Sequence, residues 1–386
     1  MIIIEQMINF VKQEYVLVIA SVFAIVTMVF VPPNMQYFTY IDYSVIGLLF
    51  CLMVVVAGFS ELGVLDFIST KLITKARNIK ILIIILVNCV FFSAMLFTND
   101  VALIAFIPIT IGIFNSVGRE KLIFTIVLET IAANLGSMLT PIGNPQNLYL
   151  FSYYHLSLLN FIKIVLPVGI IGYIIIMGVL FASKSGNTAV SIQQRSTFGN
   201  KRGLFSYFVG LFILCVLTVL RILDYRICVF IVMISIVVFN RGLFKKVDYS
   251  LLLTFVAFFV FVGNIGQLSI VKDAFSSFLI DRVFVTGVLS SQVISNVPAA
   301  MMLSQFTNDA RNILLGVNVG GLGTPIASLA SLISFKLYTK SEGATPVKYL
   351  GVFTVYNVTI LLLLMLAVFL FNFLGVYNSA LIYLVS

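Results

Sequence analysis

One motif interrupts two apolar segments, one in each half of this sequence. The first copy runs from Ala133 to Asn144 (ANLGSMLTPIGN), and the second, 184 positions later, runs from Val317 to Ser328 (VNVGGLGTPIAS). Asn, Gly, Thr, Pro and Ile recur at identical spacing in both copies. Paired interruptions in the two halves of an apolar chain indicate broken transmembrane helices that meet at a transporter's binding site. Gly and Pro are also generally commoner in membrane helices than in soluble ones, but that alone does not explain the matched spacing.

The composition agrees with a chain that resides in a lipid bilayer. Hydrophobic residues make up 61% of the chain and charged residues 10%, with a mean hydropathy of +1.15, whereas soluble domains have roughly 45–50% and 25%. The apolar runs lack the alternation of barrel strands, so only helices can satisfy their backbone groups. We therefore expect an all-α polytopic membrane protein. The four cysteines lie in apolar runs without metal-ligand spacing and are interpreted as small core residues.

The apolar segments predict about nine transmembrane helices, two of them broken. They are placed at roughly 13–31, 44–62, 122–150 (broken), 161–182, 203–221, 227–240, 250–268, 312–336 (broken) and 350–375. Two further runs, 80–115 and 282–307, are interrupted by polar residues. From Asn296 to the next polar cluster the helix would extend roughly 16 Å, against a hydrocarbon core of about 30 Å. We therefore expect run 282–307, and by analogy run 80–115, to be re-entrant hairpins.

The basic residues of the loops predict the orientation. With both hairpins drawn, 17 of the 23 lysines and arginines fall on one face and six on the other, so the positive-inside rule places the N-terminus in the cytoplasm. The first run has no small-residue cleavage site after it, and we expect it to stay attached. The two halves then have opposite topology, as an inverted repeat requires. The expected division is 1–182 for the first repeat, 183–203 for a cytoplasmic linker and 204–386 for the second repeat. The net charge of +9 thus reflects membrane orientation, and no nucleic-acid partner is expected.

Each interruption contains small polar residues followed by a helix start. Asn144 is suited to be an N-cap, and Pro145 to be the first helical residue, where a missing N–H costs nothing. Thr324 with Pro325 repeats this arrangement, as do Asn296 and Pro298. Amides freed at such breaks bind anions, and freed carbonyls bind cations.

Asp100 is the strongest single candidate for a functional residue, since an ionisable group far from either membrane interface is by default a functional candidate. Its structural alternative is a cap on the helix beginning at Val101, or contact with water. Glu129 is a second candidate carboxylate, and pairing or snorkelling near the cytoplasmic boundary beside Lys121 is its alternative. The single histidine, His155, excludes a histidine ligand set. No lysine or arginine lies near the middle of a span, so a bound anion would rely on amides, hydroxyls and a co-bound cation. A neutral or cationic solute fits equally well.

These motifs resemble those of the ion transporter superfamily, which includes divalent anion:sodium symporters, citrate transporters, arsenite permeases and a sodium/proton antiporter branch. The resemblance covers nearly the whole chain and is carried by the hairpin tips at 98–100 and 295–298 and by the broken-helix motifs. It implies that Asn99 and Asn296 contact substrate and that the surrounding loops bind ions. It also implies a rigid scaffold with a moving transport domain, often as a homodimer. Two departures are Asp100 in place of Thr and the Ser-Asn-Val-Pro tip, which is closer to the citrate and arsenite branches.

The resulting prediction is a secondary active transporter of a small, anionic solute, of the dicarboxylate, tricarboxylate or oxyanion type, coupled to Na⁺ or H⁺ in the cell membrane. An arsenite or oxyanion efflux permease, a sodium/proton antiporter and a channel are the alternatives. The sequence has no P-loop and no nucleophile, base or metal constellation, so no enzymatic activity, no cofactor and no metal beyond Na⁺ are expected. The candidate substrate-binding residues are Asn99, Thr140, Pro141, Asn144, Asn296, Thr324, Pro325 and Ser328. The candidate cation-binding or coupling residues are Thr98, Asp100, Gly136, Gly143, Ser295, Val297, Gly320 and Gly323.

Overall fold

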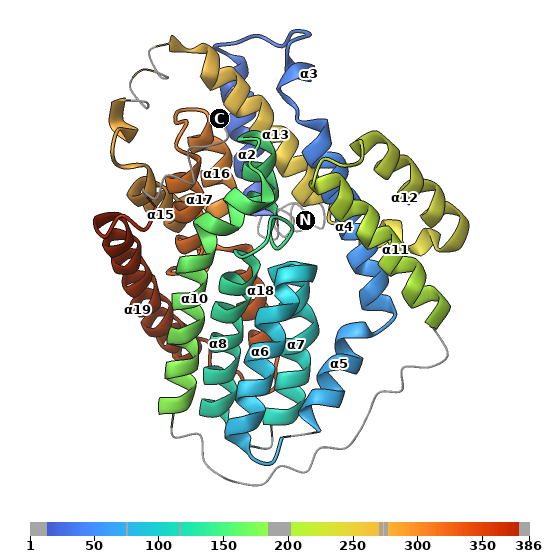
Figure 1. Ribbon diagram of the computed structural model, residues 1–386, viewed down its shortest axis with the longest axis vertical. Coiled ribbons are helices and arrows are strands. Elements are labelled where there is room, and N and C mark those ends of the chain that lie inside the picture. Colours follow the sequence, from blue (N-terminus) through green and yellow to red (C-terminus); the bar gives the residue numbers. More distant parts are fainter. Residues whose placement is uncertain are drawn as a thin grey trace, which may run out of the picture.

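The computed structural model describes residues 14–74, 76–115, 117–183, 202–269, 273 and 277–377. Every regular element within those ranges is a helix (Figure 1). Five helices are long and apolar enough to cross a membrane by length and composition, and five shorter helices are also apolar. The all-α membrane fold class is therefore confirmed. The first 13 residues and most of the expected linker, 184–201, lie outside the described residues, so the position of the N-terminus remains a prediction.

The predicted first repeat contains apolar helices, one hairpin and one broken helix. In chain order its elements are α2 (Tyr15–Met28), α3 (Tyr37–Tyr40), α4 (Tyr43–Glu61), α5 (Val64–Ile73), α6 (Ile79–Phe97), α7 (Asn99–Phe114), α8 (Arg119–Ser137), α9 (Pro145–Tyr153) and α10 (Leu158–Ala182). Helices α6 and α7 form the hairpin, and α8 and α9 form the broken helix. The short helix α5 was not predicted.

The second repeat has the same plan. Its elements are α11 (Arg202–Val219), α12 (Tyr225–Phe239), η1 (Arg241–Lys246), α13 (Tyr249–Gln267), α15 (Val283–Ile294), α16 (Asn296–Ser304), α17 (Ala310–Val319), η2 (Pro325–Ala327), α18 (Leu329–Thr339) and α19 (Pro346–Phe373). Helices α15 and α16 form the second hairpin, and α17 and α18 form the second broken helix. Among the described elements, α11 has no counterpart in the first repeat.

Helices of one repeat pack against helices of the other, and the equivalent pair of helices is also in contact when the two repeats are interchanged. Helix α2 packs on α13 as α12 packs on α4, and the hairpin arm α7 packs on α18 as α16 packs on α9. Each hairpin also packs on the first half of its own broken helix, and Figure 1 shows α6, α7 and α8 side by side in its lower half. This packing places one arm of each hairpin beside the second half of the other repeat's broken helix.

Helices α4, α11 and α12 form a separate packing group beside this centre (Figure 1). Three of the four cysteines lie in it, and the Sγ atoms of Cys215 and Cys228 are 3.9 Å apart. All four cysteines are buried and free of disulfide bonds, which agrees with their interpretation as small core residues.

Candidate substrate and cation site

The two hairpin tips share one unusual backbone conformation. Thr98 has φ 73° and ψ 153°, and Ser295 has φ 73° and ψ 155°. This region is nearly confined to glycine and costs of order 1–3 kcal/mol for other residues, so it persists only where the surroundings hold it. Both tips turn directly into a helix, because α7 begins at Asn99 and α16 at Asn296. Strained backbone at equivalent points of both repeats makes the two tips candidates for a functional site.

Each tip is tied to the break of its own repeat by an equivalent hydrogen bond. The Thr140 hydroxyl donates to the Met95 carbonyl at 2.6 Å, and the Thr324 hydroxyl donates to the Gln292 carbonyl at 3.1 Å. Met95 precedes the Thr98 tip by three residues, as Gln292 precedes Ser295. The threonine of the repeated motif therefore fastens hairpin to broken helix in both halves.

The two breaks are also bonded to each other. Ser328 Oγ donates to Asn134 Oδ1 at 2.9 Å, and the equivalent bond in the other direction runs from Asn144 Nδ2 to Asn318 Oδ1 at 3.4 Å. Asn318 Nδ2 also donates to Asn147 Oδ1 at 2.6 Å. All five side chains are buried. Buried amides with complete partners fix one geometry, so the breaks form a single unit.

The asparagines of the tips lie against this unit. Asn99 Nδ2 donates to Asn134 Oδ1 at 3.3 Å, while Asn99 Oδ1 accepts from the Asp100 backbone N–H at 2.9 Å. Asn296 lies beside Gly321, where a Cβ would come within 2.9 Å of Asn296 Nδ2. Both asparagines are about 4% exposed, so only a small part of each amide is presented for binding.

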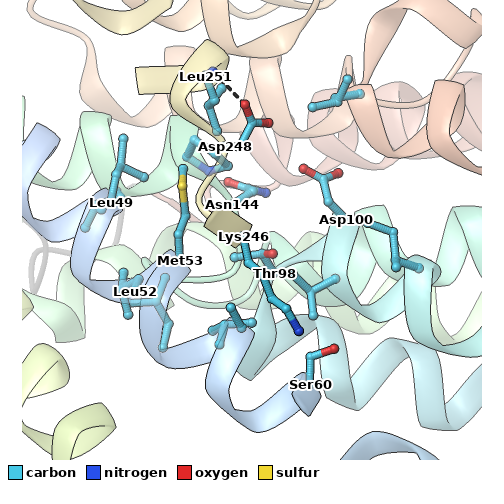
Figure 2. A pocket seen from close by; sticks show the side chains of 18 of the residues that line it. Leu49, Leu52, Met53, Ser60, Thr98, Asp100, Asn144, Lys246, Asp248 and Leu251 are labelled. Atoms are coloured by element: carbon cyan, nitrogen blue, oxygen red, sulfur yellow. Dashed lines mark hydrogen bonds between the residues drawn. The ribbon is translucent and has the colours of Figure 1, made fainter. Parts of the chain in front are cut away.

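A cavity of about 230 Å³ opens between the two tips. Six of the predicted site residues line it: Asn99, Asp100, Ser295, Asn296, Val297 and Ser328. A second cavity of about 280 Å³ shares the Asp100 and Pro145 wall and continues along α4 (Figure 2). Thr98 and Asn144 line this second cavity, among mostly apolar side chains. The structure thus brings eight of the sixteen predicted residues to connected space.

The charges around the first cavity are mostly acidic. Glu14, Asp100 and Asp248 line it together with one base, Lys336. Asp100 Oδ1 is buried and has no hydrogen-bond partner within the described part of the chain. Asp248 instead caps α13 by accepting from the Leu251 N–H at 2.9 Å (Figure 2). Asp100 is not the cap suggested as its alternative, because α7 already begins at Asn99 and the Asp100 side chain accepts no backbone N–H there.

Comparison with known proteins identifies the family of this chain. Residues 1–310 match the family described as citrate transporter. The chain belongs to the citrate transporter family. It is 35% identical over 305 residues to an uncharacterized transporter of Methanocaldococcus jannaschii, covering 78% of this chain and 83% of that protein. It is 29% identical over 305 residues to the inner membrane protein YbiR of Escherichia coli, covering 77% and 80% of the two chains.

A shorter match connects this citrate transporter family member to a plant protein. The silicon efflux transporter LSI3 of Oryza sativa is 29% identical over 132 residues, which cover 34% of this chain and 27% of that protein. Family and relatives together identify a multi-pass membrane transporter, and not an enzyme. Among the described residues no group of three His, Cys, Asp or Glu side chains is arranged to hold a metal ion.

The other eight predicted residues frame the breaks and border neither of these two cavities. They are Thr140, Pro141, Thr324, Pro325, Gly136, Gly143, Gly320 and Gly323. The glycines allow close packing: a Cβ on Gly136 would lie 2.1 Å from the Phe91 carbonyl oxygen, and one on Gly143 would lie 2.2 Å from the Ser137 carbonyl oxygen. Their roles in binding remain predictions, and the structure shows how they support the residues that do border the cavities.

Four residues of this centre were not among the predicted ones: Asn134, Asn147, Asn318 and Gln292. A signal existed for Asn134 and Asn318, because each is the asparagine with which the shared part of the repeated motif begins. Asn147 and Gln292 have no such signal, since the equivalent positions in the other repeat are Ser331 and Met95.

Glu129 lies in α8, away from both cavities. Its side chain is fully buried, and Oε1 accepts a 2.6 Å hydrogen bond from the Thr110 hydroxyl on α7. Oε2 is buried without a partner in the described chain. Pairing beside Lys121 at the membrane boundary is therefore wrong, because the carboxyl group faces the interior of the helix bundle.

Proposed function

We propose that the protein is a secondary active transporter that moves a small, anionic solute by Na⁺- or H⁺-coupled alternating access. The dicarboxylates, tricarboxylates and oxyanions are the solute classes that fit best. The observation that carries this proposal is the cavity between two strained hairpin tips, which combines amides and hydroxyls with an unpartnered carboxylate oxygen. The amide and hydroxyl donors would bind an anion, and the carboxylate would bind the coupling cation.

The donors come from both repeats. Asn99 and Asn296 bring amides, and Ser295 and Ser328 bring hydroxyls, to the lining of one cavity. The Ser328 hydroxyl already donates to Asn134, so a solute that binds there would compete with that bond. Carboxylate and oxyanion oxygens accept such hydrogen bonds, and charge-assisted bonds are stronger than neutral ones. Both tip residues are the first of their helices, so the positive ends of the α7 and α16 dipoles also favour negative charge here.

The acidic lining supports cation coupling. Three carboxyl groups and one lysine surround the first cavity, so a bare anion would enter an unfavourable field. A cation bound at Asp100 removes one negative charge and lowers the cost of bringing the anion out of water. The solute and the cation then stabilise each other, which is the physical basis of symport.

The lining of the cavity, together with the predicted orientation, supports a proposal for the side that has access in this conformation. Glu14 and Asp248 lie at the starts of α2 and α13, and Lys336 lies near the end of α18. The loop charges assign these ends to the cytoplasm, so we propose that this is the inward-facing state. The unit of hairpins and broken helices would then move against α2, α4 and α13 to reach the outward-facing state.

Efflux of an uncharged oxyacid or of arsenite is the second candidate. It is supported by the similarity to the rice silicon efflux transporter and by the amide and hydroxyl donors, which serve a neutral hydroxylated solute as well.

Proteoliposomes with separate sodium and proton gradients test the proposal. Radiolabelled citrate, succinate, arsenite and silicic acid are offered in turn, with empty liposomes as the control. Cation-driven uptake of a carboxylate or oxyanion is expected. Extrusion of arsenite or silicic acid supports the second candidate, cation exchange without solute indicates an antiporter, and flux that ignores both gradients indicates a channel. Either of the last two results contradicts the proposal.

A further inference from the structure

The second break contains a side-chain amide that has no equivalent in the first. Gln292 Nε2 donates to the carbonyls of Gly320 at 2.7 Å and Leu322 at 2.9 Å. Gln292 Oε1 accepts from the Thr324 backbone N–H at 2.8 Å. The two carbonyls and the opposing N–H fix which end of the amide is which. This side chain therefore occupies the space between hairpin and loop in one defined orientation.

The loop is shaped for this amide. Gly323 has φ +105°, and a Cβ on it would lie 2.3 Å from Gln292 Oε1. Only glycine combines that backbone conformation with that close approach. Gly323 thus leaves space for the Gln292 amide. The residue equivalent to Gly323 in the first repeat is Leu139, which carries a bulky side chain.

In the first repeat the described residues of the hairpin present no side-chain amide to the loop, and the Asn99 backbone N–H donates to the Gly143 carbonyl at 3.2 Å. The position equivalent to Gln292 is Met95, which the shared threonine bond identifies. The first loop receives its amide from the opposite side: Asn147 of α9 donates to the carbonyls of Ser137, Met138 and Thr140 at 3.1 to 3.3 Å. Among the described residues, the first hairpin therefore contributes no side-chain donor to the carbonyls of its loop.

Loop carbonyls at a broken helix are the groups that bind coupling cations in transporters of this architecture. We propose that the Gln292 amide takes the place of a coupling cation at the second break, so that cation coupling is confined to the first repeat. The tip residues show the same asymmetry independently. The first tip has the unpartnered carboxylate of Asp100, and the second has Val297 at the equivalent position. A carboxylate attracts a cation, whereas an amide donor replaces one.

The inference rests on the proposed cation coupling, and thermal unfolding of the purified full-length protein tests it without any solute. The four buried free cysteines report unfolding through a thiol-reactive fluorophore. Midpoints are compared in sodium, lithium and choline chloride. Gln292→Glu keeps the shape but turns an oxygen toward the two carbonyls, and it should be stabilised by sodium or lithium more strongly than wild type is. Gln292→Met, which copies Met95, should lose stability equally in all three salts.

The reciprocal change is Met95→Gln, which should weaken the sodium or lithium response of wild type, as Asp100→Asn should. The proposal is overturned if Gln292→Glu responds to the salts as wild type does. It is also overturned if the wild-type response survives in Asp100→Asn and Met95→Gln but disappears in Gln292→Met. If wild type shows no cation response while Gln292→Glu does, the assignment of Gln292 holds and the proposed coupling fails.

Discussion

The hydroxyl of Ser328 donates a 2.9 Å hydrogen bond to Asn134 Oδ1. This bond joins the break of the second repeat to α8, the first half of the broken helix of the first repeat. Asn134 also accepts from Asn99 at one hairpin tip. The contact connects both repeats and a tip through one amide oxygen. Ser328 of the second break and Asn99 of the first tip therefore share one acceptor.

Loss of this bond should reduce transport more than stability. Ser328→Ala should lower the free energy of unfolding by about 1 kcal/mol and transport by about tenfold or more. Ser334→Ala is the matched control, since Ser334 is also buried, lies in α18 and bonds the Tyr349 hydroxyl at 2.9 Å. It should cost similar stability and leave transport intact. Initial uptake rates and unfolding midpoints measure both, and equal loss of transport in the two variants contradicts the site.

The tip asparagines should be essential for transport and dispensable for insertion. Asn99→Ala and Asn296→Ala each remove an amide from the cavity, and we expect each to abolish solute uptake with normal amounts of protein in the membrane. Asn357→Ala removes an equally buried asparagine that bonds only the Phe353 carbonyl among described residues, and should retain uptake. Normal uptake by either tip variant would remove that asparagine from the site.

Asp100→Asn should alter the dependence of transport on cation and pH. The change keeps the shape and removes the charge, so uptake should lose its response to the sodium or proton gradient while folding is preserved. Asp309→Asn is the control, because Asp309 caps α17 by accepting from the Asn312 N–H at 2.9 Å. It should lower stability and leave the cation dependence unchanged. If both variants keep the wild-type profile, Asp100 has no role in coupling.

Gly136→Ala should separate the first hairpin from its broken helix. The new Cβ would lie 2.1 Å from the Phe91 carbonyl oxygen, which is backbone and cannot move aside cheaply. We expect destabilisation by about 2–4 kcal/mol. Gly112→Ala, in α7, meets nothing within 4 Å and should be neutral or slightly stabilising. Unfolding midpoints of the two variants decide, and a tolerated Gly136→Ala would contradict the close packing.

Glu129 should tolerate only an isosteric change. Glu129→Gln keeps an oxygen that accepts from Thr110 and should alter the free energy of unfolding by less than about 1 kcal/mol. Glu129→Ala leaves a cavity and an unsatisfied hydroxyl, and should cost about 2–4 kcal/mol. Urea or thermal unfolding measures both. Equal stability of the two variants would show that the Thr110 bond contributes nothing.

Much of the fold is encoded locally and was predicted from the sequence. Each tip and break is a short polar stretch in an apolar background, so these features could be located from the sequence. Uninterrupted apolar runs were equally informative: α13 was expected at 250–268 and is observed at Tyr249–Gln267. The amide of Gln292 shows the limit of such reasoning. A single glutamine in an apolar helix has no local signature, and its partners are about 30 residues further along the chain. Eight predicted residues frame the breaks for a similar reason, because spacing identifies a break and not which side chains face the cavity.

The bonds between the breaks have a consequence for biosynthesis. The polar groups of Asn134 and Asn144 find Ser328 and Asn318 only after most of the second repeat has been made. Until then the first repeat holds buried amides without their final partners inside the bilayer, where unsatisfied polar groups are costly. We therefore expect a ribosome-released first half alone to be a substrate for membrane quality control, and its rescue by a separately expressed second half to reveal when the two sets of partners meet.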